Sequence, residues 1–281
     1  MQVMPAEQEI ELSPGLEYGS KVKVTNIGRL AFNFTVSARP YQVLNEDYDP
    51  DFSTENSYTK LHNWISFAQT SYHLEPNAST DVEFTIEVPA DVAGGGQYAA
   101  IIIETRDSQD SNATMKTINQ LASLLYAHIE GEEHVGGVLM SHRLPRFLLG
   151  SPFSSTVTIK NDGNVDFRAE HTLTIYDFFT NREVFTPDTV DSNERPLGTA
   201  NPVILPATSR VSRLTWEGAP QLGVFRAVSH VSFLDQDSTK EQIVFICPVW
   251  LAGIVIFFIV LMILWIVLRI HKHKQNKPQV V

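Results

Sequence analysis

Residues 249–268 read VWLAGIVIFFIVLMILWIVL, a stretch without a single charged or strongly polar side chain. An α-helix rises about 1.5 Å per residue, so roughly 20 such residues cross the hydrocarbon core of a bilayer once. A buried helix of a soluble protein rarely has an apolar stretch longer than about 14 residues. The stretch therefore predicts a single transmembrane helix, which we expect over residues 248–268 with Pro248 in its first turn.

The residues that flank this span predict its orientation. Trp250 and Trp265 stand near its two ends, where indole rings favour the headgroup level, and Arg269 follows directly. We expect these three residues to be the membrane-interface anchors. Residues 269–281 (RIHKHKQNKPQVV) carry bases and no acid, whereas residues 235–242 (DQDSTKEQ) are acid-rich. Because positive residues stay inside, we expect a single-pass protein of the cell membrane with an extracellular N-terminal region and a basic cytoplasmic tail over residues 269–281.

The remainder of the chain is acidic. Of its 21 bases four lie in the tail, which leaves 17 bases against 32 acids and a net charge of −15 for residues 1–268. Such a surface repels nucleic acid and anionic lipid, so we expect no nucleic-acid partner. The one cysteine, Cys247, lies at the membrane boundary. An extracellular region without a disulfide is unusual for an animal protein and ordinary for a bacterial one, so the sequence favours a bacterial origin.

An exported protein normally starts with a basic and then apolar leader. The first residues, MQVMPAEQEIELSPG, contain no apolar stretch of the required length. Two explanations stay open: a leader that is absent from this sequence, or a span that acts as a reverse anchor. We favour the first, since residues 8–12 already have the pattern of a strand in a mature domain.

Short alternating segments fill residues 1–247. Apolar and polar residues alternate at residues 7–12, 22–25, 32–39 and 82–88, which is the period of a half-buried strand. Turn residues separate these segments every 8 to 15 positions, and no helical periodicity of any length occurs. This pattern predicts an all-β fold of antiparallel, immunoglobulin-like sandwiches.

The same order of motifs occurs twice along the chain. An alternating strand ends at an Asn, with a Gly two residues later, in both halves. A Leu–Pro turn and a Gly-x-aromatic strand follow in each copy. We therefore predict two tandem sandwiches, one at residues 1–132 and one at 133–247, followed by the transmembrane helix. The paired segments are Ser13–Gly28 with Gly150–Gly163, Leu74–Val88 with Leu205–Trp216, and Gly96–Tyr98 with Gly223–Phe225.

This layout resembles the WxL-interacting protein family of bacterial surface proteins. The motifs that carry the resemblance are EIELSPG leading to KVTNIG, VPADVAGGGQYAAIII, and LPATS at the start of a strand in the second copy. The resemblance covers the whole chain, although the matching residues belong to turns and strands. It implies that the outer domain attaches to the cell wall and that the inner domain captures a partner protein. No binding residue of the family can be placed on a numbered position of this chain.

Catalytic and cofactor motifs are not found in the sequence. There is no GxSxG elbow and no phosphate-binding loop, since Gly94–Gly96 is followed by neither Lys nor a helix. The histidines between residues 128 and 142 match no zinc spacing. Asp47, Asp49 and Asp51 have alternate-oxygen spacing but lack the glycine and glutamate of an EF-hand, so only a looser calcium site stays open there. We expect a protein that is not an enzyme and has no cofactor and no resident metal.

Two long loops are the candidates for recognition. The loop over residues 41–63 brings Tyr41, Tyr48, Phe52 and Tyr58 among acids, a mixture that suits stacking on sugars or a protein hot spot. Residues 185–205 form a second long loop without periodicity. The alternative for both is that the aromatic side chains pin the loop to the sandwich.

The sequence thus favours a single-span binding or scaffold protein of the bacterial cell surface. Its partner would be cell-wall polymer (peptidoglycan) or another surface protein, and its C-terminal helix would contact the lipid bilayer. Two alternatives stay open, namely an adhesion or signalling receptor that contacts a partner cell, and an accessory subunit of an envelope enzyme or transport complex.

Overall fold

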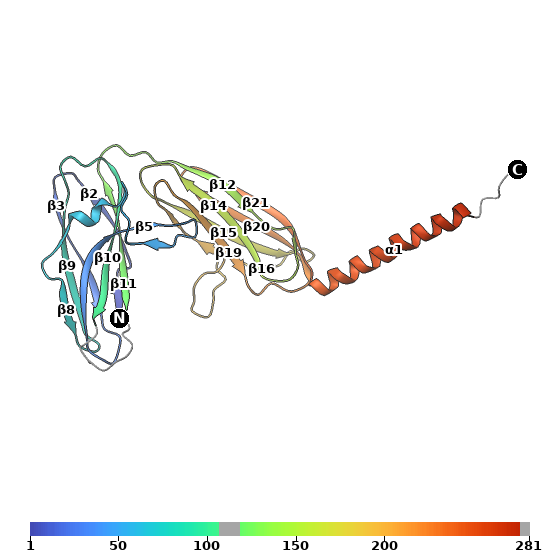
Figure 1. Ribbon diagram of the computed structural model, residues 1–281, viewed down its shortest axis with the longest axis horizontal. Coiled ribbons are helices and arrows are strands. Elements are labelled where there is room, and N and C mark those ends of the chain that lie inside the picture. The colour runs from blue at the N-terminus through green and yellow to red at the C-terminus, as the bar shows by residue number, and fades with distance from the viewer. Residues whose placement is uncertain (107–118, 276–281) are drawn as a thin grey trace. The chain divides into compact units, whose positions relative to one another are not determined.

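A computed structural model describes residues 1–106 and 119–275 of the chain. Strands dominate this part of the chain and the helix α1 (Val249–Gln275) closes it, so the predicted all-β fold with a C-terminal helix is confirmed (Figure 1). The strands are β1 (Gln2–Met4), β2 (Glu7–Leu12), β3 (Glu17–Thr25), β4 (Phe32–Pro40), β5 (Gln42–Val43), β6 (Pro50–Asp51), β7 (Ile65–Phe67), β8 (Ser71–Leu74), β9 (Ser79–Glu87), β10 (Gly95–Arg106), β11 (Gln120–Ile129), β12 (Gly137–Arg143), β13 (Phe147–Leu148), β14 (Phe153–Asn161), β15 (Phe167–Asp177), β16 (Glu183–Phe185), β17 (Thr199–Ala200), β18 (Val203–Ile204), β19 (Ser209–Trp216), β20 (Gly223–Phe233) and β21 (Gln236–Ile246).

Two facing sheets form the sandwich of the first half. One has the strand order β1-β3-β9-β7 and the other the order β2-β11-β10-β4-β8. Successive side chains of a strand point to opposite faces of its sheet, so every second side chain points inward. The inward side chains of both sheets meet in one core. Its largest members include Phe34, Ile86, Ile101 and Ile129.

The strand order of the first half recurs in the second. The order β12-β14-β19 repeats β1-β3-β9, and β13-β21-β20-β15 repeats β2-β11-β10-β4. In both halves the chain leaves one sheet after its first strand and joins the other sheet in a parallel pair, β2 with β11 and β13 with β21. The predicted antiparallel pairing therefore holds for their neighbours but not for these two pairs. A second core contains Phe153, Leu173, Trp216 and Phe225.

The compact units of the chain do not follow the sheets. Unit 1 consists of Met1–Met140, Thr158–Arg168 and Val203–Val211, and unit 2 of Ser141–Val157, Ala169–Pro202 and Ser212–Val281. Two segments that belong by sequence to the second half thus pack as part of unit 1. The domain limit at residues 132 and 133 stays a prediction.

The loops contain structure that the sequence did not reveal. A 3-10 helix η1 (Lys60–Trp64) and the short pair β5–β6 lie in the stretch expected as loop 41–63. Strands β17 and β18 lie in the stretch expected as loop 185–205 and pair with β15. Elements of two to five residues are too short to show periodicity.

Candidate functional site

The loop over residues 41–63 is folded back on itself. Strands β5 and β6 pair within its first half, and the turn between them is closed by backbone hydrogen bonds from Leu44 N to Asp49 O, 2.9 Å, and from Tyr48 N to Asn45 O, 3.1 Å. The Asn45 side chain donates to the Asp49 carboxylate at 2.7 Å. Tyr48 takes a positive φ of 65° at the tip, a conformation that the surrounding contacts must stabilise.

Tyr41 and Phe52 belong to an aromatic cluster on the outer face of β10 and β11. Tyr41 is buried, with Phe52 stacked against it at 6.0 Å between ring centroids and the ring of Tyr126 edge-on at 6.1 Å. Tyr98 then meets Tyr126 edge-on at 5.8 Å. Such pairs stabilise a packed surface beyond the area they bury.

Tyr48 is fixed by a different part of unit 1. Its hydroxyl accepts a hydrogen bond from the backbone N of Leu205 at 2.7 Å and lies 2.6 Å from the Thr208 hydroxyl. The Arg210 guanidinium covers the ring, 4.1 Å from its centroid. Burial raises the pKa of the Tyr48 hydroxyl, so this side chain stays neutral at physiological pH.

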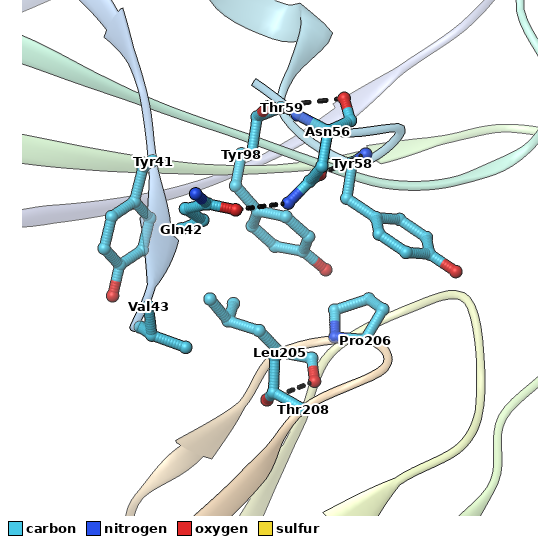
Figure 2. Close-up of a pocket in the computed structure, with 10 residues that line it drawn as sticks. All are labelled: Tyr41, Gln42, Val43, Asn56, Tyr58, Thr59, Tyr98, Leu205, Pro206 and Thr208. Carbon is cyan, nitrogen blue, oxygen red and sulfur yellow. Dashed lines mark hydrogen bonds between the residues drawn. The ribbon is translucent and has the colours of Figure 1, made fainter. Parts of the chain in front are cut away.

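A small pocket opens beside Tyr58. Its volume is about 50 Å³. Figure 2 shows the rings of Tyr58 and Tyr98 facing Leu205 and Pro206, all within unit 1. The polar groups of the wall are satisfied locally, since the Asn56 amide donates to Gln42 at 2.7 Å. The lining residues are Tyr41, Gln42, Val43, Asn56, Tyr58, Thr59, Tyr98, Leu205, Pro206 and Thr208.

The pocket is too small for a cofactor or a metabolite. Sites for such ligands usually enclose about 300 to 1,000 Å³, while a single water needs roughly 10 to 15 Å³. The space fits a few waters or the tip of one side chain. Recognition at this loop would therefore take place by surface contact.

The predicted ligand-contact residues thus divide into two pairs. Tyr41 and Tyr48 serve to pin the loop, as the alternative reading expected. Phe52 and Tyr58 are half-buried, as Tyr48 is, but their side chains take no part in the hydrogen bonds that tie Tyr48 to Leu205 and Thr208. Contact of any of these four residues with a ligand stays a prediction.

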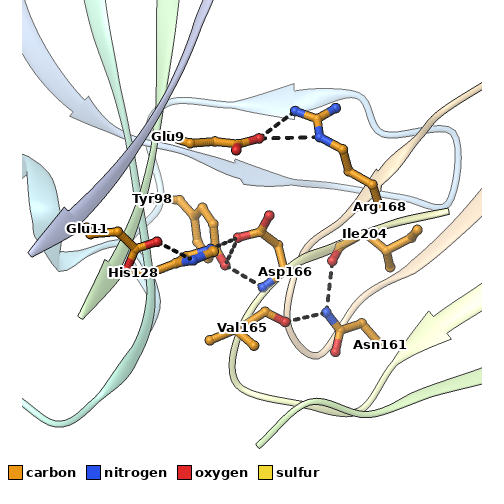
Figure 3. A network of polar contacts seen from close by, with 9 residues as sticks. All are labelled: Glu9, Glu11, Tyr98, His128, Asn161, Val165, Asp166, Arg168 and Ile204. Atoms are coloured by element: carbon orange, nitrogen blue, oxygen red, sulfur yellow. Dashed lines mark hydrogen bonds and ion pairs between the residues drawn. The ribbon is translucent and has the colours of Figure 1, made fainter. Parts of the chain in front are cut away.

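A carboxylate network lies close to the pocket (Figure 3). Asp166 accepts a hydrogen bond from the Tyr98 hydroxyl at 2.7 Å, and its own backbone N donates back to that hydroxyl at 3.0 Å. His128 Nε2 lies 2.9 Å from the same Asp166 oxygen, and Glu11 lies 3.4 Å from His128 Nδ1. The Asp166 side chain is almost fully buried.

The network raises the pKa of two of its members, His128 and Tyr98. The hydrogen bond to Asp166 raises the pKa of His128. Burial, together with the Asp166 charge, raises the pKa of Tyr98 far above its ordinary value. Tyr98 is therefore a permanent donor to Asp166, and His128 gains positive charge as the pH falls. The hydrogen bonds from Tyr98 and the contact with His128 fix Asp166, and with it the segment 158–168, within unit 1.

Two ion pairs of Arg168 lie on the surface of unit 1 beside this network. Arg168 contacts Glu9 at 2.8 Å and Glu7 at 3.4 Å, which places opposite charges along the edge strand β2. Exposed pairs of this kind contribute about 1 kcal/mol or less, but charges on an edge strand discourage pairing with another chain.

The acidic run at residues 47–51 is held by its own hydrogen bonds. Asp51 accepts from the hydroxyl and backbone N of Ser53 and from the Gln42 amide, and these bonds, led by the Ser53 hydroxyl, lower its pKa. Asp49 is engaged by Asn45. Among the residues that the structure describes, no group of three His, Cys, Asp or Glu side chains could hold a metal ion. Asp49 and Asp51 thus make the local hydrogen bonds that are typical of carboxylates in turns.

The expected membrane anchors lie on α1. Val249–Arg269 has a mean hydropathy of 3.2 with none of its most apolar window buried, so in the described part of the chain this helix is long and apolar enough to cross a membrane. Trp250 and Trp265 are exposed, and the Arg269 guanidinium lies 5.0 Å from the Trp265 ring centroid. The helix continues to Gln275, beyond the predicted end at residue 268.

Sequence reasoning missed the partnership of Tyr98, His128 and Asp166. In the sequence His128 stood out only among histidines that match no zinc spacing, and Tyr98 only as part of the repeated Gly-x-aromatic pattern. Their proximity depends on segment 158–168 packing onto strands β10 and β11, and no local pattern carries that information.

Comparisons with known proteins show no family. No family model matches the chain, and no curated protein matches it. Solved structures with a similar arrangement include a chain of the CsuC–CsuE chaperone and tip-adhesion-subunit complex of Acinetobacter baumannii, with 12% identity, a TM-score of 0.43, and coverage of 86% of this chain and 97% of that one. The class 5 fimbriae chaperone CfaA gives 10% identity, a TM-score of 0.41, and coverage of 86% and 98%. The chaperone DraB of E. coli gives 10% identity, a TM-score of 0.38, and coverage of 86% and 96%. These likenesses are too distant to support an argument about function.

Proposed function

We propose that the chain is a binding protein of the bacterial cell surface, held in the cell membrane by α1 and displaying its β-sheets outside. The join between strand and helix carries the proposal: β21 ends at Ile246 and α1 begins at Val249. With only Cys247 and Pro248 between them, a helix embedded in lipid keeps the sheet that contains β21 at the membrane surface. The orientation is supported by the basic residues that follow the span.

We propose surface contact as the mode of binding. Half-buried aromatic rings next to acids form a patch around Phe52 and Tyr58, with Asp47, Asp49 and Glu55 exposed nearby. Rings of this kind suit a protein hot spot or the face of a sugar, and the adjoining pocket of about 50 Å³ admits only a side-chain tip. The partner is another surface protein or the cell-wall polymer. Membership of the WxL-interacting protein family would agree with this proposal and stays a prediction.

The orientation is tested with a protease on intact cells. A tag at the C-terminus of the full chain should be retained on a fragment that contains α1, while the sheets are digested. Survival of the full-length chain on intact cells, with digestion after lysis, would overturn the outward orientation.

Binding is tested with the full chain in detergent micelles, mixed either with isolated cell walls or with extracted surface proteins. Phe52→Ser and Tyr58→Ser should weaken capture of one of the two. Leu16→Ser is the matched control, because Leu16 is equally apolar, 55% exposed and outside the loop. Equal capture by all variants would exclude the aromatic patch, and no capture from either source would remove the binding function.

A further inference from the structure

The exposed phenylalanines of the described chain gather at one end of a sheet. Outside α1 they are Phe147, Phe178, Phe179 and Phe245, exposed by 74%, 44%, 80% and 42%. All four belong to unit 2. Large exposed rings in one region of a soluble surface mark a contact site, whereas single apolar side chains elsewhere need no explanation.

The strand register places these rings at the end of the sheet from which α1 departs. Phe147 pairs with Phe245 and Leu148 with Ile246, which is the last residue of β21. Gly223, the first residue of β20, also pairs with Ile246. The β15 strand ends at Asp177 opposite Phe225, so the turn that carries Phe178 and Phe179 projects from the same end.

The rings form two ordered pairs. Phe147 and Phe245 stack at 5.3 Å between centroids, and Phe178 meets Phe179 edge-on at 5.4 Å. Phe178 N donates to Val224 O at 3.2 Å, which ties the turn to the start of β20. Leu149 and Leu222, exposed by 65% and 61%, extend the apolar surface.

The opposite end of the same hairpin differs in character. There β20 turns into β21 through Leu234 and Asp235, followed by Asp237. Among the described residues, no exposed aromatic side chain lies at this tip. The one large exposed apolar side chain there is Leu234, 43% exposed. The two ends are 11 residues of β20 apart, about 35 Å at 3.3 Å per residue.

The length of the connection decides what covers the aromatic end. From Ile246 to Val249 the chain advances three residues, which span at most about 10 Å. The headgroup region on each side of a bilayer is roughly 5 to 8 Å thick. Side chains that project from this end therefore reach the headgroup region once α1 is inserted, and apolar side chains such as Phe and Leu are favoured at the boundary between headgroups and acyl chains.

We propose that Phe147, Phe178, Phe179 and Phe245, with Leu149 and Leu222, form a lipid-contact face that seats unit 2 on the bilayer beside α1. The inference rests on the proposed membrane insertion of α1. It adds a second contact between protein and membrane, which restricts how far unit 2 tilts around the short connection.

The test uses the full chain with Cys247→Ser, reconstituted in vesicles of phosphatidylcholine and phosphatidylglycerol. Single cysteines introduced by Phe179→Cys, Phe147→Cys or Leu234→Cys carry an environment-sensitive nitrobenzoxadiazole dye. The first two sites probe separate segments of the face, and Leu234 is the matched control at the other end of the hairpin. Far-UV circular dichroism checks that each variant folds.

Dyes at positions 179 and 147 should emit at shorter wavelength and be quenched by lipids that carry a nitroxide near the headgroup, while the dye at 234 should show neither effect. Emission and quenching at 179 and 147 that equal those at 234 would overturn the proposal. A shift to shorter wavelength without lipid quenching would also overturn it, because a second copy or another protein then covers the face. Retention in the membrane at alkaline pH, measured on the same samples, tests the insertion of α1 separately.

Discussion

A buried asparagine performs the same task in both halves of the chain. Asn26 donates its amide to Leu30 O and Leu74 O at 2.9 and 3.1 Å and accepts from Gly28 N at 2.9 Å. Asn161 donates to Val165 O and Ile204 O and accepts from Gly163 N, each at 2.8 Å. The spacing of both local partners is identical. The Asn-x-Gly repeat seen in the sequence is thus a repeated set of hydrogen bonds, which explains why the residue types recur.

Replacing Asn161 by Ala should lower the free energy of unfolding by about 3 kcal/mol. Asn161 is fully buried, and its loss leaves two carbonyls and one N–H without hydrogen-bond partners. Each such group costs about 1 kcal/mol or more of stability. Denaturant unfolding of the full chain in detergent micelles measures the effect. Asn193→Ala is the control, since Asn193 is exposed and should change stability by less than about 0.5 kcal/mol. Equal effects of the two substitutions would contradict this account.

Glycine is required under an aromatic ring in both copies of the Gly-x-aromatic strand. A Cβ on Gly96 would lie 2.0 Å from the Tyr98 hydroxyl, and one on Gly223 would lie 2.5 Å from the Phe225 ring. We expect Gly96→Ala and Gly223→Ala each to lower the free energy of unfolding by about 1 to 3 kcal/mol through overpacking. Gly19→Ala is the matched strand control, because a Cβ there meets nothing within 4 Å. Thermal unfolding of the three variants provides the comparison, and a loss at Gly19 as large as at Gly96 would refute the steric reason.

His171 makes the stability of unit 2 depend on pH. It is fully buried beside the hydroxyls of Ser155, Ser212 and Ser229, at 3.0, 2.9 and 3.1 Å. Burial, with a smaller contribution from His142, lowers the pKa of His171 to about 4. The unfolded chain takes up a proton near pH 6.5, whereas the folded chain does so only near pH 4. Its contribution is therefore complete above about pH 6.5 and is lost as the pH falls through 4.

The expected loss is about 3 kcal/mol between pH 7 and pH 4. His171→Gln should flatten that part of the profile, and the same substitution at exposed His73 should leave it unchanged. Denaturant unfolding at a series of pH values measures both. An identical slope for the wild type and His171→Gln would show that other groups govern the acid limb.

At the scale of elements, the alternation of apolar and polar residues predicted strands but not their partners. Period 2 identified residues 7–12, 32–39 and 82–88, which lie in β2, β4 and β9 except for Val88, one residue beyond the end of β9. It did not reveal that β1 and β2 join different sheets, because a strand that changes sheets keeps the same alternation. Residues 235–240 are almost all polar and look like a turn in the sequence, but β21 already begins at Gln236, which pairs with Phe233. Strand residues that are polar and exposed to solvent resemble a turn in the sequence.

The resulting turn of two residues strains its first member. Leu234 has a positive φ of 50°, a conformation that costs an ordinary residue about 1 kcal/mol and suits Asn. Leu234→Asn should therefore raise the free energy of unfolding by about 0.5 to 1 kcal/mol, measured by thermal unfolding. Val190→Asn is the control, since Val190 is a similarly exposed apolar residue outside the positive-φ set. A decrease for Leu234→Asn would show that the Leu side chain contributes more than the strain removes.

At the scale of the whole molecule, the limits of the two halves stay a prediction, and the compact units combine segments from both halves. Segments 158–168 and 203–211 pack within unit 1, where Leu205 joins the cluster of Tyr41, Tyr98 and Tyr126. That packing buries Tyr41 and ties Tyr48 to Leu205, so two of the four expected contact residues hold the loop in place. Long-range packing of this kind depends on the tertiary fold, so local periodicity could single out the aromatic loop but not which of its rings stay accessible.

A fragment of residues 1–132 should be less stable than residues 1–247 and should bind a hydrophobic dye. The cut removes Asp166 from Tyr98 and Leu205 from the aromatic cluster, leaving a buried hydroxyl without its acceptor and several rings uncovered. Dye fluorescence and the midpoint of denaturant unfolding of the two fragments measure the difference. Equal midpoints without dye binding would mean that residues 1–132 are complete in themselves.

The direct join of β21 to α1 also has a mechanical consequence. In the proposed arrangement, a load applied to the sheet that contains β21 reaches α1 through Cys247 and Pro248 alone, so there is no slack to absorb it. All 11 residues of β21 are in register with β20, and a pull along β21 shears those hydrogen bonds together rather than opening them one after another. If the proposed attachment and binding hold, the protein transmits tension from its partner to the membrane instead of yielding to it.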